Sequence, residues 1–231
     1  MIGKKQQEQI RLLEKKLRIA FKDKKLLLQA VTHPSARTKG KPDYERLEFL
    51  GDAVLDVVTA EMLLNEYPLS DEGTLSKLRA ALVNAKSLAE IARTLSITEL
   101  IIMSKSEEAS GARNRDSLLA DVFEAIVGAV YLDQGFNKAK KWLEKLFSAP
   151  VKTVVPQDPK TELQEFLQAQ GIPVPEYRLK YKSGPDHSPE FVYSVIIEDK
   201  EEGTGRGKSK KEAQQKAAFK ALQKLNKEKK I

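Results

Sequence analysis

Hydrophobic residues recur at three- and four-residue spacing through the first 148 residues, which is the pattern of amphipathic helices. Ile10, Leu13 and Leu17 predict a first helix, and a long helix is expected to begin near Tyr44. Further helices are expected at residues 76–95 and 117–132. Runs of alternating hydrophobic and polar residues are lacking here. The pattern therefore predicts an all-α domain.

A different pattern follows the proline-containing segment VKTVVPQDPK, residues 151–160. Asp158 and Pro159 are typical of a helix start, and Gly171 of its end. Two strand-like runs, EYRLKYK and FVYSVIIED, come next, with a short third candidate around GTGRGK. Capping-box spacing in SKKE, residues 209–212, predicts a last helix. The chain is thus predicted to be multidomain: an all-α domain at 1–150, a linker at 151–157 and an α+β domain (α-β-β-β-α) at 158–227.

The segment ERLEFLGDAVLD, residues 45–56, predicts a helix with one acidic face. At about 100° per residue, Glu45, Glu48 and Asp52 fall within roughly 60° of one another. Apolar residues gather on the opposite side. Since like charges so close together destabilise a helix, either cations neutralise them or the face is simply solvated.

A second helix, LLADVFEAIVGAVYLD at residues 118–133, carries two acids on a largely apolar background. Small Ala125, Gly128 and Ala129 predict close packing, where the unpaired carboxylates of Asp121 and Glu124 would be costly. A surface edge is the alternative. The sequence has no cysteine and only two histidines, so a metal site would use oxygen ligands, which suit Mg²⁺, with Mn²⁺ as a substitute. Pairs of such ions, about 3.5–4 Å apart, assist phosphodiester displacement. Spacing alone does not show that the two helices meet.

Charge along the chain favours an anionic partner. The net charge is +7, but residues 206–230 contain ten basic and two acidic residues, a local +8 that leaves about −1 for the rest. The longest apolar stretch, residues 125–132, is too short to span a bilayer, and the N-terminus lacks the apolar core of a signal peptide. We therefore expect a soluble cytoplasmic protein with no membrane contact and no small-molecule cofactor.

ERLEFLGDAVLD, DEGTLSKLRAALV and RDSLLADVFEAIVGAVYLD resemble, in this order, three sequence blocks of ribonuclease III nuclease domains. The resemblance covers most of residues 10–148. It implies an all-helical homodimer in which each subunit's acidic site lies in a valley crossing the dimer interface. By this resemblance the metal ligands are Glu48, Asp52, Asp121 and Glu124, with Asp52 and Glu124 the least replaceable catalytic pair.

The same resemblance places other residues near the site. Glu45 and Glu72 match catalytic acids nearer the RNA, although Glu45 could be a solvated charge and Glu72 an ordinary loop acid. His33 matches a position near a helix start, where a buried or capping histidine is favoured over a catalytic one. Arg37 is a departure, because the family often has an aromatic residue there.

GPDHSPEF and GKSKKEAQQKAA, within the α-β-β-β-α pattern, resemble the double-stranded-RNA-binding domain over residues 157–227. Such domains read duplex RNA by shape, through phosphates and 2′-hydroxyls. The resemblance implies that Thr161, Gln164, Glu165 and His187 face minor grooves, and that Lys208, Ser209, Lys210 and Lys211 bind phosphate at a helix start. An uninvolved polar helix face, a bystander histidine and a solvated charge run are the alternatives. Gln214 stands where many members have lysine.

Together the resemblances imply a metal-dependent endonuclease that cuts double-stranded RNA, leaving 5′-phosphate and 3′-hydroxyl ends with short 3′ overhangs. They further imply processing of ribosomal RNA precursors and of some messenger and transfer RNA precursors in a bacterial cytoplasm. A non-catalytic RNA-binding protein would be expected to have replaced Asp52 or Glu124, which this sequence retains. The second domain disfavours a nuclease for DNA or single strands.

Overall fold

The structure is a computed structural model that describes residues 3–37, 42–156, 158–185 and 189–228. His187 lies outside these residues. The chain divides into two compact units, Met1–Glu66 with Leu82–Thr153 and Tyr67–Ala81 with Val154–Ile231. In the described part of the chain, no helix has the length and apolar character that crossing a membrane requires.

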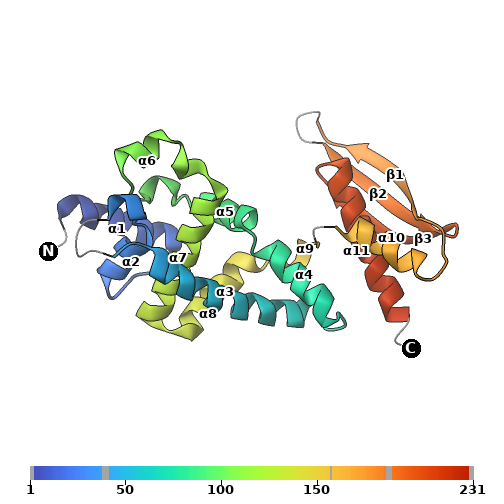
Figure 1. Ribbon diagram of the computed structural model, residues 1–231, viewed down its shortest axis with the longest axis horizontal. Helices are drawn as coiled ribbons and strands as arrows, with labels where there is room; N and C mark the ends of the chain where they lie inside the picture. Colours follow the sequence, from blue (N-terminus) through green and yellow to red (C-terminus); the bar gives the residue numbers. More distant parts are fainter. Residues whose placement is uncertain (1–2, 38–41, 157, 186–188, 229–231) are drawn as a thin grey trace. The chain divides into compact units, whose positions relative to one another are not determined.

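The first part of the chain is helical, as the hydrophobic pattern predicted (Figure 1). Its helices are α1 (Lys4–Leu17), α2 (Lys24–Ala30), α3 (Glu45–Glu66), α4 (Glu72–Leu82), α5 (Ala85–Thr94), α6 (Lys105–Ala109), α7 (Asp116–Gln134), α8 (Phe136–Phe147) and α9 (Pro150–Thr153). Three 3₁₀ turns, η1 (Pro34–Ala36), η2 (Thr98–Leu100) and η3 (Ala112–Asn114), join some of them.

Helix α7 forms the centre of this helical core. Between Leu118 and Val130 its residues are buried except Asp121 and Glu124, which are half-buried. Phe123 stacks on Trp142 of α8, with ring centroids 5.9 Å apart. The two acids therefore interrupt a helix that is otherwise enclosed by protein.

Two boundaries differ from the sequence expectation. The helix expected at residues 76–95 is divided into α4 and α5, because the Asn84 side chain accepts a hydrogen bond from Ser87 N at 2.9 Å and caps a new helix. The expected linker at 151–157 also begins too early: α9 extends to Thr153, and its Val151 is buried.

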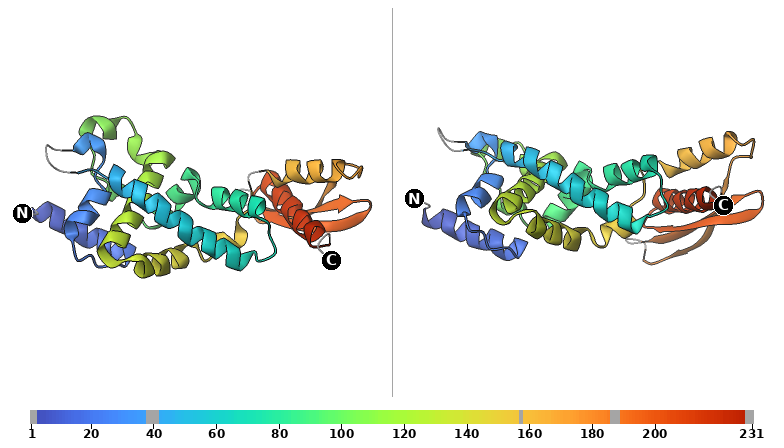
Figure 2. Two further views of the ribbon diagram at one scale, coloured as in Figure 1. Left: turned by 60° about the horizontal axis from the view of Figure 1, so that its bottom comes forward. Right: turned by 90° about the horizontal axis from the view of Figure 1, so that it is seen from below.

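The second domain has the predicted order of elements: α10 (Pro159–Gln168), β1 (Glu176–Ser183), β2 (Glu190–Ile197), β3 (Lys200–Gly207) and α11 (Lys210–Glu228). The strands form an antiparallel sheet in the order β1-β2-β3. Both helices cover the same face of the sheet (Figure 2). Its core joins Leu163 and Leu167 of α10, Val195 and Ile197 of β2, and alanines of α11.

The strand boundaries are the main difference in this domain. Residues 198 and 199 were expected in the second strand, but Glu198 (φ 47°) and Asp199 (φ 64°) form a two-residue turn, the geometry preferred in tight hairpins. Consequently β3 begins at Lys200 and is longer than the short strand expected around residues 203–208.

Candidate active site and RNA-binding surface

Helices α3 and α7 approach each other backbone to backbone at two glycines. A Cβ atom built on Gly51 would overlap the carbonyl oxygen of Glu124, and one on Gly128 would overlap that of Leu47. Only residues without a side chain allow this approach. The crossing explains how two acidic segments about 70 residues apart in sequence come together.

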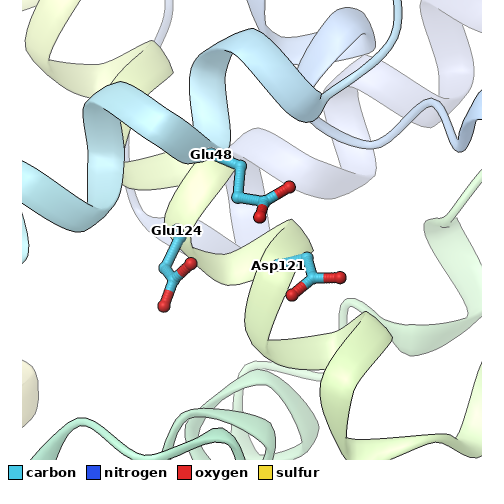
Figure 3. A group of neighbouring side chains, drawn as sticks. All are labelled: Glu48, Asp121 and Glu124. Carbon is cyan, nitrogen blue, oxygen red and sulfur yellow. The ribbon is translucent and has the colours of Figure 1, made fainter.

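Three carboxylates gather at this crossing. Glu48 of α3 and Asp121 and Glu124 of α7 each offer an oxygen, and these oxygens all lie within 4.8 Å of one another (Figure 3). Asp52 is exposed one turn beyond Glu48, and its charge raises the pKa of both Glu48 and Glu124. The structure thus brings together three of the four acids expected to be metal ligands, and Asp52 lies near enough to act on two of them through its charge.

The pKa values show that these charges oppose one another. Burial, followed by repulsion from Asp52, Asp121 and Glu48, raises the pKa of Glu124 from 4.5 to about 8. Burial and neighbouring acids also raise the pKa of Glu48, and burial raises that of Asp121. Strongly raised carboxyl pKa values in a cluster are typical of sites that hold cations or perform acid–base chemistry.

Tyr44 connects the start of α3 to this cluster. Its side chain is 5% exposed and its hydroxyl donates a hydrogen bond to Asp121, which lowers the raised pKa of that acid. His33 packs against the Tyr44 ring edge to face, with centroids 5.8 Å apart, and Nδ1 of His33 accepts a hydrogen bond from Ser35 N. His33 therefore caps η1, as favoured from the sequence.

Arg37 also acts at the start of α3. It forms an ion pair with Asp43 at 3.2 Å, and Asp43 is 5% exposed. Asp43 in turn accepts a hydrogen bond from Glu45 N at 3.3 Å. Arg37 thus neutralises a buried acid at the start of α3.

The two remaining predicted acids lie at the starts of α3 and α4. Glu45 is exposed, but its charge contributes to the raised pKa of Glu48, which places it nearby. Glu72 is the first residue of α4 rather than a loop residue, and its carboxylate accepts a hydrogen bond from Ser76 at 2.8 Å.

In the second domain, Thr161, Gln164 and Glu165 are exposed on one face of α10. A pocket of about 690 Å³ brings Thr161 and Gln164 beside Lys211 of α11. Asp158 caps α10, accepting bonds from Thr161 N and the Thr161 hydroxyl at 3.3 and 2.7 Å. One edge of the domain thus combines residues from both helices.

The start of α11 presents lysines to solvent. Lys208, Lys210 and Lys211 are exposed, as is Ser209, whose hydroxyl accepts a bond from Glu212 N at 3.1 Å. The Glu212 carboxylate accepts from Lys208 N at 2.8 Å, one residue earlier than in a standard capping box. The free N–H groups of this helix end and the lysines together favour phosphate.

Comparisons with known proteins agree with the assignment of both domains. A family model described as Ribonuclease-III-like matches residues 23–150, and a double-stranded RNA binding motif matches residues 159–225. Ribonuclease 3 of Geobacillus sp. (strain WCH70) is 46% identical over 233 residues, covering 97% of this chain and 94% of the relative. The chain belongs to the ribonuclease III family.

Solved structures extend the comparison for the nuclease domain. The nuclease domain of ribonuclease III from Campylobacter jejuni matches with 47% identity and a TM-score of 0.57, covering 61% of this chain and 94% of that one. Another structure of that domain, described as flexible in a region involved in dimer formation, has 48% identity and a TM-score of 0.56 and covers 60% and 99%. The resemblance inferred from the sequence is confirmed.

Several contacts of this chain were not predicted from its sequence. Tyr44 lies beside Asp121, and the Asp56 charge contributes to the raised pKa of Glu124. The spacing of Glu48, Asp52 and Asp56 by four residues was the available signal for Asp56. Lys160 was missed as well: its ammonium lies 4.5 Å from the Tyr177 ring centroid and binds the Gln214 side chain at 2.9 Å.

Proposed function

We propose that this chain is a divalent-metal-dependent endonuclease for double-stranded RNA. The observation that carries the proposal is the convergence of Glu48, Asp121 and Glu124, with a Glu124 pKa near 8, at a crossing of two helices. Carboxylates held together in this way need compensating positive charge. The attached RNA-binding domain supplies the substrate class.

The acids fit a magnesium or manganese site in their donor chemistry. Glu48, Asp52, Asp121 and Glu124 would hold the metal through oxygen, the ligand these ions prefer. A bound divalent ion supplies charge that lowers the pKa of water and stabilises the leaving oxygen. Tyr44 holds Asp121 in place through its hydroxyl, so this ligand is oriented before any ion arrives.

We propose that Glu45, Glu72 and the second domain contact the RNA. Glu45 and Glu72 would act near the scissile strand. Thr161, Gln164, Glu165 and His187 would face minor grooves, and the residues at the start of α11 would bind phosphates: Lys208, Ser209, Lys210 and Lys211. The exposure of the described residues in this set supports the assignment.

A homodimer through the nuclease domain is part of the proposal. Phe49, Val57 and Leu64 are 82%, 56% and 58% exposed, and their spacing puts them on one side of α3. Exposed apolar rows of this kind mark interfaces. This row runs beside the acidic face, so pairing of two copies would place two acidic sites along one interface. Sedimentation should give a dimer for the wild type and a monomer for Phe49→Glu.

The products and substrates follow from family membership. We propose 5′-phosphate and 3′-hydroxyl ends with short 3′ overhangs, made from ribosomal RNA precursors and from some messenger and transfer RNA precursors in the bacterial cytoplasm.

Cleavage of a labelled perfect RNA duplex, with magnesium or with EDTA, tests the activity. The wild type should cut only with magnesium. Glu124→Gln should bind the duplex within about twofold of the wild type but cut it at least about 10³-fold more slowly, because one ligand loses its charge. Glu99→Gln, which changes an exposed acid of η2, serves as the matched control.

Binding of the duplex by the wild type without cleavage would instead identify a non-catalytic RNA-binding protein. Cleavage that persists in EDTA would refute the metal requirement. Equal loss of activity in Glu99→Gln would show that the Glu124→Gln effect is not specific to the cluster.

A further inference from the structure

A basic groove lies in the first unit, away from the acidic cluster. It is formed by the end of α1, the end of α5 and one side of α8, and its volume is about 760 Å³. No residue of α3 or α7 lines it. This size is within the range of ligand-binding clefts.

Six cationic side chains line the groove, and none of the described residues that line it is acidic: Lys15, Lys16, Arg18, Lys138, Lys141 and Lys145. None of the six has an ion pair with an acid among the described residues. Two acids close to these lysines in sequence face other cations, since Glu14 pairs with Lys24 and Glu144 lies 3.9 Å from Lys140. The groove is therefore a concentrated positive surface.

Local helix stability accounts for only part of this charge. Lys15 and Lys16 lie in the last turn of α1, where cations stabilise the helix end. On α8, Lys145 lies in the last turn, but Lys138 and Lys141 do not. The spacing of these three lysines, by three and four residues, puts them on one side of α8, over about 10 Å of helix.

The floor of the groove is aliphatic. Leu12 is 42% exposed there, and Leu95 and Leu146 are half-buried beside it. Trp142 is only 8% exposed, because its ring stacks on Phe123 and its Nε1 donates a bond to Leu17 O at 3.1 Å. It offers no open aromatic face on which a nucleobase could stack, as single-stranded nucleic acid prefers.

We propose that this groove docks an acidic amphipathic helix from a partner protein. Leucine-like side chains of the partner would cover the aliphatic floor, and its carboxylates would meet the lysines on the α1 and α8 walls. Charge complementarity favours this occupant over a neutral apolar peptide, and the exposed Leu12 favours it over a nucleic-acid backbone, which presents only phosphates and sugars. The docking is independent of RNA cleavage.

A synthetic helix of about 18 residues, with leucine along one face and glutamate on both flanks, is the probe. Fluorescence anisotropy with the full chain at near-physiological salt should show saturable micromolar binding. The triple variant Lys138→Gln/Lys141→Gln/Lys145→Gln should bind at least about tenfold more weakly, and so should Leu12→Ser. A peptide of the same composition, with its leucines scattered around the helix, should also bind at least about tenfold more weakly.

The matched control is Lys5→Gln/Lys86→Gln/Lys105→Gln, which removes the same charge at exposed sites outside the groove. It should bind the probe within about twofold of the wild type. Equal weakening in both triple variants, equal binding of the scattered peptide, or no saturable binding would overturn the proposal. Displacement of the probe by duplex RNA, together with weaker RNA binding by the groove variant alone, would make the groove an RNA contact instead.

Discussion

The acidic cluster and the start of α11 are both proposed to bind a charged ligand, but their residues are arranged in different ways. Glu48, Asp121 and Glu124 are half-buried where α3 and α7 cross, and burial together with neighbouring acids raises the pKa of Glu48 and Glu124. Lys208, Lys210 and Lys211 are exposed on a helix end. The first site is closely packed and electrostatically unfavourable on its own, whereas the second is open and solvated.

This difference follows from what each site must do. An ion held for chemistry needs several ligands at fixed positions, so the protein accepts repulsion among carboxylates until the ion binds. Duplex RNA carries a phosphate at every nucleotide, so many weak and adaptable contacts suffice. The acidic site should therefore be sensitive to single substitutions, and the basic site only to several.

The largest effect is expected at the helix crossing. Gly51→Ala would force a methyl group into the Glu124 carbonyl, so we expect a loss of at least about 3 kcal/mol in unfolding free energy, with cleavage abolished. Gly73→Ala, whose added Cβ would meet nothing nearer than the Asp71 side chain at 3.8 Å, is the control and should unfold like the wild type. Thermal denaturation measures both. A stable, active Gly51→Ala would show that the two helices can separate without loss of the site.

The basic site should respond more gradually. Each phosphate contact contributes about 0.9 to the slope of log affinity against log salt, so Lys208→Gln/Lys210→Gln/Lys211→Gln should reduce that slope by two to three. Loss of these phosphate contacts should also make the affinity for duplex RNA about 10–100-fold lower. Salt titrations of binding measure this, with Lys200→Gln/Lys220→Gln as an exposed control in the same domain. If each lysine removed in the control lowers duplex affinity as much as each lysine removed at the start of α11, only the overall charge of the domain matters.

Prediction from the sequence was most successful for features that lie within a single helix. The acidic face of α3, the acids of α7 and the Asp158 and Ser209 caps depend on spacing within one helix, which the sequence displays directly. The helix crossing could be suspected from the small residues of α7 but not located. Gly51 and Gly128 meet only because the chain folds back between them.

Other features were beyond single-sequence reasoning for the same reason. The link from Tyr44 to Asp121 spans 77 residues, and Arg37 compensates Asp43 through a contact that no local pattern indicates. The turn at Glu198 and Asp199 was missed because both residues lack the usual Asn-Gly or Gly signal for a two-residue hairpin.

The third prediction concerns the repulsion within the acidic cluster. Because the pKa of Glu124 rises from 4.5 to about 8 on folding, the folded state holds this proton more tightly than the unfolded state. Its stabilising contribution is therefore complete below pH 4.5 and is lost as the pH rises to about 8. In EDTA, the Glu124→Gln variant should match the wild type in melting temperature near pH 5 and exceed it by about 2–6 °C above pH 8.

Magnesium should reverse this difference by stabilising the ionised wild type. Melting curves in EDTA and in magnesium, from about pH 5 to about pH 9, measure both effects. If the difference in melting temperature between the wild type and Glu124→Gln does not change with pH, the packing of Glu124, and not its charge, sets the stability of the crossing.

The smallest effect is expected where this chain departs from the family pattern. Gln214 replaces a common lysine, but its side chain accepts a hydrogen bond from the Lys160 ammonium at 2.9 Å, so a positive charge already lies there. Gln214→Lys would bring two ammonium groups together and should change duplex affinity by less than about twofold. In a Lys160→Gln background, the same substitution should instead restore affinity. A gain above about fivefold for Gln214→Lys alone would show that Lys160, fixed over the Tyr177 ring, cannot reach the phosphates that a lysine at position 214 would contact.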